Sequence, residues 1–365
     1  MWNSFHILRQ QYNTASKTMN KKLSIIFSRE NNIYFNLALE NYLLSKFSSG
    51  FPNKAHANVP MIYLWRNSPS VIIGRNQNVW SECNLDNIKK DNVNLVRRFT
   101  GGGAVYQDLG NTCFTFISSA NDYNFEANSK LICSALGKLI GEKCEPSGRN
   151  DLCVNGLKFS GAAFKVLPDA ALHHGTLLIN LNTGSLEKYL TPDKSKLAKH
   201  NVKSVKSRVA NLAQFKPDIT HDEVSNTIIK EAMEYYNAEN EEIIILGRDS
   251  SFCEEEGFKD CLDKLTNEKW IYGPKMLECK AFKKRFDFGS FEFCLDVNND
   301  TVESAWIYSD TLNSDFVDYL NLQFNKNPFL FNANSFNKIL SECEFPNCKE
   351  MISEIKEWIC QENFV

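Results

Sequence analysis

The stretch at residues 97–116, RRFTGGGAVYQDLGNTCFTF, places two arginines and three consecutive glycines between strand-like runs. Glycine loses more conformational freedom on folding than any other residue, so three in a row need a reason. Backbone N–H groups in a glycine loop can approach an anion directly, and the forked donors of Arg97 and Arg98 add fixed positive charge. The stretch therefore predicts either a tight turn or bulge, or a cradle for a phosphate or carboxylate.

The composition of the sequence and the motifs that it lacks exclude several classes of protein. The sequence contains no G-x-x-x-x-G-K-[ST] loop, and the triple glycine runs into a strand instead of opening a dinucleotide-binding helix. The twelve cysteines include no C-x-x-C pair, which predicts reduced, buried thiols. The net charge of -3 gives no basic signal for nucleic acid, and no apolar run is long enough to span a membrane.

The apolar patterns on both sides of the glycines predict an α/β fold. Asn84 and Thr220 are the expected N-caps of two helices, and Gly141 is the expected end of a third. Two apolar runs separated by NSPS indicate a strand–turn–strand unit. Strands are expected at 22–28, 60–67, 70–76, 93–99, 103–108, 111–119, 157–166 and 173–181, and helices at 31–47, 84–93, 124–141 and 220–236.

The C-terminal part of the sequence predicts a separate small α+β unit. A meander of strands is expected over 270–275, 285–297 and 301–310, followed by helices near 334–343 and 348–360. The expected domains are therefore a catalytic unit at 23–250 and an accessory unit at 262–365, joined by the short polar segment at 253–269.

Residues 1–28 contain no Asp or Glu and several Lys, Arg, Ser and Thr. This composition is typical of a mitochondrial presequence, and equally of a disordered basic tail. We expect a mitochondrial protein if 1–22 is a presequence, and a cytoplasmic one otherwise.

Four further stretches carry candidate chemistry. GRND at 148–151 offers Asn150 and Asp151 as oxygen ligands for Mg²⁺, or forms an Asx turn. Lys158 lies among small and apolar residues in KFSGAAFK, either at a pocket wall or facing solvent. HHGTLL has two histidines without the partner spacing of a metal site. Residues 193–211 hold many basic side chains, and form either a flap over phosphate or solvated surface.

The order of these blocks resembles the lipoate–protein ligase family, and most closely its bacterial two-domain type, lipoate–protein ligase A. The matching pieces are FNLALE, LWRNSPSVIIGRNQNVWSECN, RRFTGGGAVYQDLGNTCFTF, GRNDL, KFSGAAF, HHGTLL, SVKSRVANL and, in the small domain, SDTLN. The resemblance runs from about residue 23 to the C-terminus. Two departures are visible: Gln107 stands where the family usually has His, and residues 1–22 have no counterpart in the bacterial pattern.

The resemblance implies the biotin/lipoate protein ligase catalytic fold with a smaller C-terminal α+β accessory domain. It also implies that ATP and Mg²⁺ activate lipoate to lipoyl-AMP and that the lipoyl group then passes to an acceptor lysine, with Lys158 as the catalytic residue. By correspondence the ATP contacts are Arg98, Gly103, Ala104, Val105, Tyr106, Asn150 and Lys158. The lipoate contacts are Trp65, Arg97, Gly102, Val105, Lys158 and His174, and Asp151 is the candidate Mg²⁺ ligand. On this view the glycines keep bare backbone against the adenylate.

The resemblance leaves several alternatives open. A related transferase could use preformed lipoyl-AMP or another acyl donor, and some relatives transfer through a cysteine thioester, for which Cys153 is the candidate. A non-catalytic acyl-binding protein is a third possibility. Expected partners are the lipoyl domains of 2-oxoacid dehydrogenase E2 subunits or the glycine-cleavage H protein, with no nucleic acid and no membrane, and the expected state is a monomer. The sequence does not distinguish lipoate from octanoate.

Overall fold

The structure is a computed structural model that describes residues 22–191, 208–238, 240–274 and 279–362. The candidate presequence, apart from its last residue, and most of the basic stretch at 193–211 lie outside the described residues. No helix within the described ranges is both long and apolar enough to cross a membrane.

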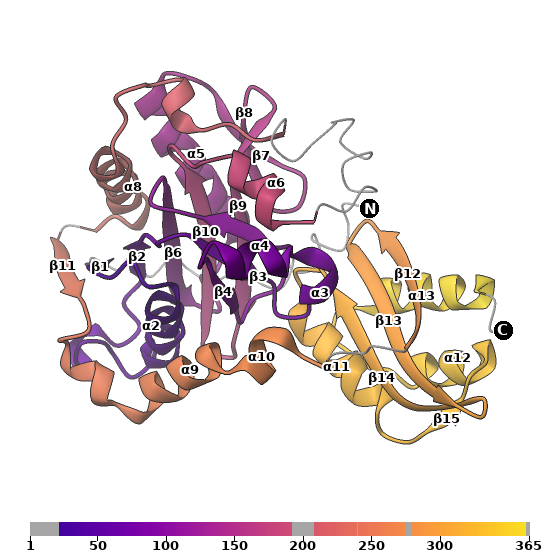
Figure 1. The fold of residues 1–365 in the computed structure, drawn as a ribbon. Coiled ribbons are helices and arrows are strands. Elements are labelled where there is room, and N and C mark those ends of the chain that lie inside the picture. The colour runs from indigo at the N-terminus through magenta and orange to yellow at the C-terminus, as the bar shows by residue number, and fades with distance from the viewer. Residues whose placement is uncertain (1–21, 192–207, 239, 275–278, 363–365) are drawn as a thin grey trace.

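The N-terminal unit is built on an eight-stranded mixed sheet (Figure 1). Strand β1 pairs in parallel with both β2 and β11, and the remaining pairs are antiparallel. In spatial order the strands are β11 (Asn240–Leu246), β1 (Lys22–Ser28), β2 (Met61–Trp65), β6 (Asn111–Ser119), β10 (Ala170–Leu178), β9 (Leu157–Val166), β8 (Asp151–Val154) and β7 (Cys144–Ser147).

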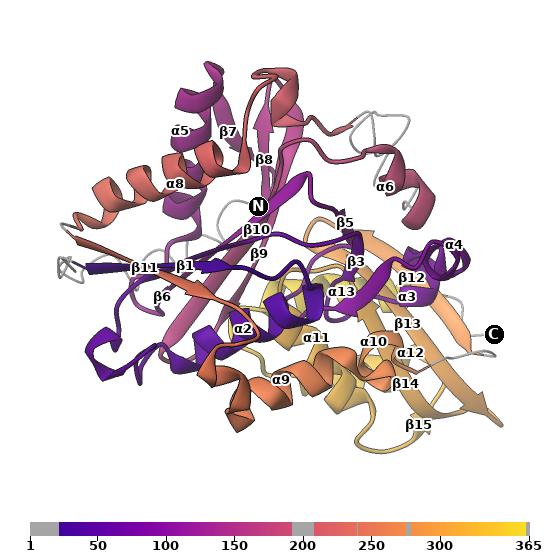
Figure 2. The ribbon, with the colours of Figure 1, turned by 60° about the vertical axis from the view of Figure 1, so that its left-hand side comes forward.

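Helices cover both faces of this sheet. Figure 2 shows α5 (Phe125–Ile140) and α8 (His221–Tyr236) on one side, and α2 (Ile33–Lys46) on the other. Their ends match the sequence expectations: Thr220 forms a capping box at the start of α8, and Gly141 ends α5 in the left-handed conformation. Leu37, Leu39 and other apolar side chains of α2 belong to one core cluster, while α5 and α8 contribute to a second one across the sheet.

A smaller three-stranded sheet holds the glycine loop. Its order is β4 (Asn94–Arg97), β3 (Ser70–Ile73) and β5 (Val105–Gln107), with β3 parallel to β4 and antiparallel to β5. The strands on both sides of NSPS are confirmed, but they do not pair, because β2 joins the large sheet and β3 the small one. The triple glycine links β4 to β5, as the sequence predicts. Short helices pack nearby: α3 (Val79–Glu82), α4 (Leu85–Lys90, capped by Asn84) and α6 (Gly184–Tyr189).

The segment between the two units is helical, which corrects two expectations. The polar stretch at 253–269 contains η4 (Ser251–Glu254) and α9 (Glu256–Thr266), and Phe258 and Leu265 pack in the same core as α2. The strand expected at 270–275 is wrong, because α10 (Glu268–Tyr272) starts from an Asn267 cap. The buried positions of α9 lie three to four residues apart among charged residues, so the sequence was interpreted as a short polar segment where the chain packs as helices.

The C-terminal unit is a four-stranded antiparallel sheet covered by three helices (Figure 1). Phe291, Phe293 and Phe336 lie at the centre of its own core. The strands expected within 285–297 and 301–310 and the two closing helices are confirmed, whereas β12, β15 and α11 were not predicted. The elements are β12 (Lys280–Phe286), β13 (Gly289–Asn298), β14 (Thr301–Ser309), α11 (Ser314–Phe324), β15 (Phe329–Leu330), α12 (Ala333–Ser341) and α13 (Lys349–Gln361). Short 3₁₀ turns elsewhere are η1 (Lys54–His56) and η3 (Leu212–Gln214).

Candidate functional site

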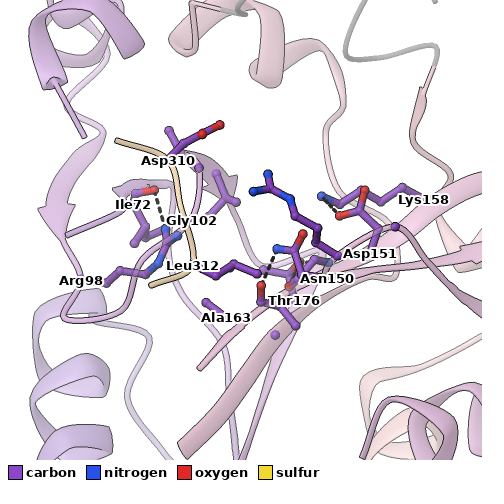
Figure 3. A pocket seen from close by; sticks show the side chains of 18 of the residues that line it. Ile72, Arg98, Gly102, Asn150, Asp151, Lys158, Ala163, Thr176, Asp310 and Leu312 are labelled. Atoms are coloured by element: carbon purple, nitrogen blue, oxygen red, sulfur yellow. Dashed lines mark hydrogen bonds and ion pairs between the residues drawn. The ribbon is translucent and has the colours of Figure 1, made fainter. Parts of the chain in front are cut away.

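A cavity of about 330 Å³ lies where the large sheet, the glycine loop and the C-terminal unit meet. In Figure 3 it is bordered by Arg98 and Gly102 on one side, by Asp151 and Lys158 on the other, and by Leu312 of the C-terminal unit. Its volume is in the range of small-molecule sites. Most of the candidate residues line it, namely Trp65, Arg98, Gly102, Gly103, Ala104, Val105, Asn150, Asp151, Lys158 and His174.

The glycine loop is held by the protein itself. Gly102 has a φ of +90°, and a Cβ there would lie 2.9 Å from Nη2 of Arg98. A Cβ on Gly101 would lie 2.4 Å from the carbonyl oxygen of Thr311, and the amide of Gly102 donates to that oxygen at 2.9 Å. The need for glycine at 101 and 102 thus comes from the C-terminal unit and from Arg98. This corrects the expectation that a ligand alone requires bare backbone here.

Arg98 is buried at the edge of the cavity. Its guanidinium donates from Nε to Oγ1 of Thr100 at 3.0 Å and to the carbonyl oxygen of Gly101. Burial lowers the pKa of Arg98 to about 10, so the side chain keeps its charge at neutral pH. A fixed cation beside the cavity is suited to an anionic ligand.

A hydrogen-bonded chain leads from Arg98 into the core. Nε2 of His174 lies 2.9 Å from Oγ1 of Thr100, and Nδ1 lies 2.9 and 3.0 Å from the two oxygens of Glu40. Because a carboxylate only accepts, Nδ1 carries a proton in the bond to Glu40, and in the neutral imidazole Nε2 then accepts from Thr100. Thr115 also donates to Glu40 at 2.6 Å. The FNLALE block therefore supplies a buried carboxylate to the site, a role that the sequence did not reveal.

Lys158 faces the cavity within a cluster of three charges. Its Nζ lies 2.7 Å from Oδ1 of Asp151, and Arg208 pairs with the other carboxylate oxygen. A Cβ on Gly161 would lie 2.8 Å from Nζ of Lys158, so this glycine makes room for the lysine. Arg208 was missed by sequence reasoning, although it lies within the block SVKSRVANL.

The described residues do not offer Mg²⁺ a ready site. Both oxygens of Asp151 are engaged by cations, and Nδ2 of Asn150 donates to the carbonyl oxygen of Ala162 at 2.6 Å. Within the described ranges, no three His, Cys, Asp or Glu side chains are grouped so that they could hold a metal ion. The residues thus do not fit a protein-bound Mg²⁺ in this arrangement.

Two candidate residues lie away from the cavity. Arg97 donates to five backbone carbonyl oxygens, those of Gly74, Arg75, Gln77, Trp270 and Ile271. Tyr106 stacks on Tyr189 in the core of the small sheet, with ring centroids 5.4 Å apart. A side-chain contact of Arg97 with lipoate, or of Tyr106 with ATP, is therefore not supported by this geometry.

The cysteine alternative has little physical support. Cys153 is buried and does not line the cavity, and burial raises the pKa of its thiol. A nucleophilic cysteine needs thiolate character and access, and Cys153 has neither.

His173, on the opposite face of β10 from His174, lies among Phe114, Phe116 and Phe125 and also stays outside the cavity.

Solved structures define the class of protein that has this fold and cavity. One match is the Plasmodium falciparum protein LipL1, which was solved in complex with lipoate. The alignment covers 93% of this chain and 100% of the LipL1 chain at 36% identity, with a TM-score of 0.81. A lipoate–protein ligase A bound with ATP covers 70% of this chain and 99% of its own at 26% identity, with a TM-score of 0.56. The fold is that of a lipoate ligase catalytic unit with an added C-terminal sheet unit.

Sequence relatives identify the family. The lipoyl protein ligase A/B catalytic domain matches residues 32–233, and the bacterial lipoate protein ligase C-terminus matches residues 280–359. Lipoate–protein ligase 1 of Plasmodium falciparum is 34% identical over 98% of this chain and 99% of its own length. Lipoate-protein ligase A of Psychrobacter cryohalolentis is 36% identical over 93% of this chain and 99% of its own length. The chain therefore belongs to the lipoyl protein ligase A/B family and is an enzyme of the ligase class.

A further solved structure concerns acceptor proteins. It is described as an archaeal lipoylation system from Thermoplasma acidophilum, with a bipartite lipoate protein ligase and its E2 lipoyl domain. This structure covers 71% of the present chain and 100% of its own at 27% identity, with a TM-score of 0.56.

Proposed function

We propose that this protein is an ATP-dependent lipoate–protein ligase that makes lipoyl-AMP and then transfers the lipoyl group to a lysine of a lipoyl-domain protein. The observation that carries the proposal is the position of Lys158. Its ammonium group lies in one cavity with the buried cation Arg98 and the glycine loop. Relatives of this family have been solved with lipoate and with ATP.

Adenylation needs fixed positive charge where negative charge develops. The lipoate carboxylate attacks the α-phosphorus of ATP, and the bond to the pyrophosphate oxygen breaks. Arg98 and Lys158 are placed to stabilise this charge, with Gly103, Ala104, Val105 and Asn150 at the same cavity wall. When ATP enters, Lys158 exchanges its bond to Asp151 for one to the nucleotide.

Transfer reuses the same lysine. The acceptor amine attacks the acyl carbonyl of lipoyl-AMP, and Lys158 is placed to stabilise the oxyanion before AMP leaves. Trp65, Val105 and Gly102 line the part of the cavity proposed for lipoate, where burial of the tail contributes about 0.8 kcal/mol per CH₂. The imidazole of His174, held by Glu40 and Thr100, borders the same space.

Mg²⁺ enters this proposal only with the nucleotide, because Mg²⁺ is commonly held by substrate phosphates with few protein ligands. Asp151 is the cavity carboxylate nearest to Lys158, and it becomes available to a metal only after Lys158 or Arg208 has moved.

The acceptor, location and assembly are further proposals. The E2 lipoyl domain in the structure of a relative supports an E2 subunit as acceptor, and the glycine-cleavage H protein is the second candidate. We propose a mitochondrial protein if residues 1–22 are a presequence, a cytoplasmic one otherwise, and a monomer. Imaging of the full chain with and without residues 1–22, and its mass in solution, test these points.

Purified protein with lipoate, ATP and a lipoyl domain tests the activity. We expect pyrophosphate release that depends on lipoate, and a lipoyl domain that gains one lipoyl group by mass spectrometry. A protein that lipoylates only from supplied lipoyl-AMP would instead support the alternative transferase function.

A further inference from the structure

A group of charged side chains from both units lines the cavity, and the roles assigned above use none of them. Arg149 lies in the turn between β7 and β8, Arg285 on β12, and Asp310 directly after β14. Nη1 of Arg285 lies 3.4 Å from Oδ2 of Asp310, whose other oxygen accepts from the amide of Ser290 at 2.7 Å. The β-sheet of the C-terminal unit thus fixes Asp310 and, through it, orients Arg285 at the cavity.

Arg149 brings an unused donor to this place. Its side chain is partly exposed, but its Nη1 is buried and has no hydrogen-bond partner in the described structure. Burial lowers the pKa of Arg149. The nearby carboxylates of Asp310, Asp151 and Asp287 oppose this shift, and the charge of Arg285 adds to it. Arg149 and Arg285 line the same space, where an anion with several oxygens can accept from the unpartnered Nη1 of Arg149 and from the forked donors of Arg285.

Contacts at the glycine loop hold the C-terminal unit in this position. The amide of Ser309 donates to the carbonyl oxygen of Asn76 at 2.8 Å, and Nδ2 of Asn76 donates to Asp318 at 2.6 Å. On the other side of the loop, the amide of Gly102 donates to Thr311. The segment that carries Asp310 is therefore attached directly to the loop that borders the proposed adenylate site.

We propose that Arg149 and Arg285 together bind the pyrophosphate part of ATP, so that the docked C-terminal unit completes the site for adenylation. The inference rests on the proposed function. A carboxylate oxygen of lipoate bonds to the α-phosphorus, the α–β bridging P–O bond breaks, and its electron pair leaves on pyrophosphate. Two forked guanidinium groups stabilise that leaving group, one from each unit. Acceptor transfer involves no pyrophosphate and does not need Arg285.

The test separates the two half-reactions in full-length protein. Arg149→Gln and Arg285→Gln are each compared with wild type for pyrophosphate release with lipoate and ATP, and for transfer from synthetic lipoyl-AMP to a lipoyl domain. We expect each variant to raise the KM for ATP at least tenfold and to weaken inhibition by added pyrophosphate. Transfer from lipoyl-AMP should stay within about threefold of wild type.

Lys283→Gln is the matched control, because it removes one exposed positive charge from the same strand and does not line the cavity. The inference is overturned if Arg285→Gln behaves like Lys283→Gln, or if both half-reactions fall equally. A wild-type protein that releases no pyrophosphate would instead contradict the proposed function itself. Because both side chains bind one anion, their effects should not add. The KM for ATP of the double variant is therefore expected to exceed that of the more impaired single variant by no more than about threefold.

Discussion

Replacing Arg97 by Gln is expected to destabilise the protein without weakening lipoate binding. The Arg97 side chain is 4% exposed and donates to five carbonyl oxygens from two segments, one next to the glycine loop and one at the end of α10. In the opposite direction, Nε1 of Trp270 donates a hydrogen bond to the carbonyl oxygen of Arg97 at 2.9 Å. This side chain therefore ties the helical linker to the small sheet.

The expected magnitude follows from these bonds. Each buried polar group left unsatisfied costs about 1–3 kcal/mol, and glutamine can reach about two of the five carbonyl oxygens. If water satisfies one of the other three, the remaining two give a loss of about 2–6 kcal/mol in the free energy of unfolding.

Urea unfolding followed by tryptophan fluorescence measures this loss, and calorimetry at a temperature where the variant is folded measures lipoate affinity. Arg98→Gln is the comparison, because Arg98 lines the cavity. A stable Arg97→Gln protein with at least tenfold weaker lipoate binding would refute this reasoning and restore the ligand contact implied by the family resemblance.

Three further predictions follow from the same structure. Gly101→Ala should loosen the C-terminal unit and speed proteolysis between the units, because its Cβ would lie 2.4 Å from the carbonyl oxygen of Thr311. Gly257→Ala is the control, because the nearest atom to its Cβ would be 4.0 Å away. Equal cleavage of the two variants would count against this prediction. Asp151→Asn should remove the ion pair with Lys158 and should lower the KM for ATP more than fivefold, because Lys158 no longer exchanges this bond for one to the nucleotide; an unchanged or higher KM would make the pair irrelevant. His173 has a pKa lowered to about 3 by burial, so stability should be insensitive to this group above about pH 6.5. Between about pH 6.5 and 3 the unfolded chain binds a proton at His173 that the folded chain does not, so the free energy of unfolding should fall by up to about 1.4 kcal/mol per pH unit as the pH is lowered. His173→Phe should show a smaller fall in acid unfolding curves. Identical curves for the variant and wild type would contradict this prediction.

The sequence predicted those parts of the fold that depend on local patterns. Thr220 and Asn84 cap their helices as expected, and the period-two pattern at 285–297 predicted the strand β13. What it did not predict depends on pairing over long distances. The two strands beside NSPS go to different sheets, and nothing in their local sequence distinguishes this from a hairpin.

The site shows the same division. Lys158 was identified from its unusual place among small residues, and Gly161 explains that neighbourhood by leaving room for the side chain. Arg97 and Arg98 look equivalent in sequence, but Arg97, the last residue of β4, makes the linker contact, whereas Arg98, directly after the strand, lines the cavity. Arg208 lies far along the chain from Asp151, so their contact could not be read from spacing.

Lys158 is proposed to act in adenylation as well as in transfer. The most direct measurement is pyrophosphate release by wild type, Lys158→Ala and Lys158→Arg, with lipoate and ATP but no acceptor, after circular dichroism has shown that all three are folded. We predict lipoate-dependent release by wild type and at least a hundredfold loss in both variants, because arginine cannot replace a compact charge on a flexible stem. Release by Lys158→Ala at the wild-type rate would contradict the central claim.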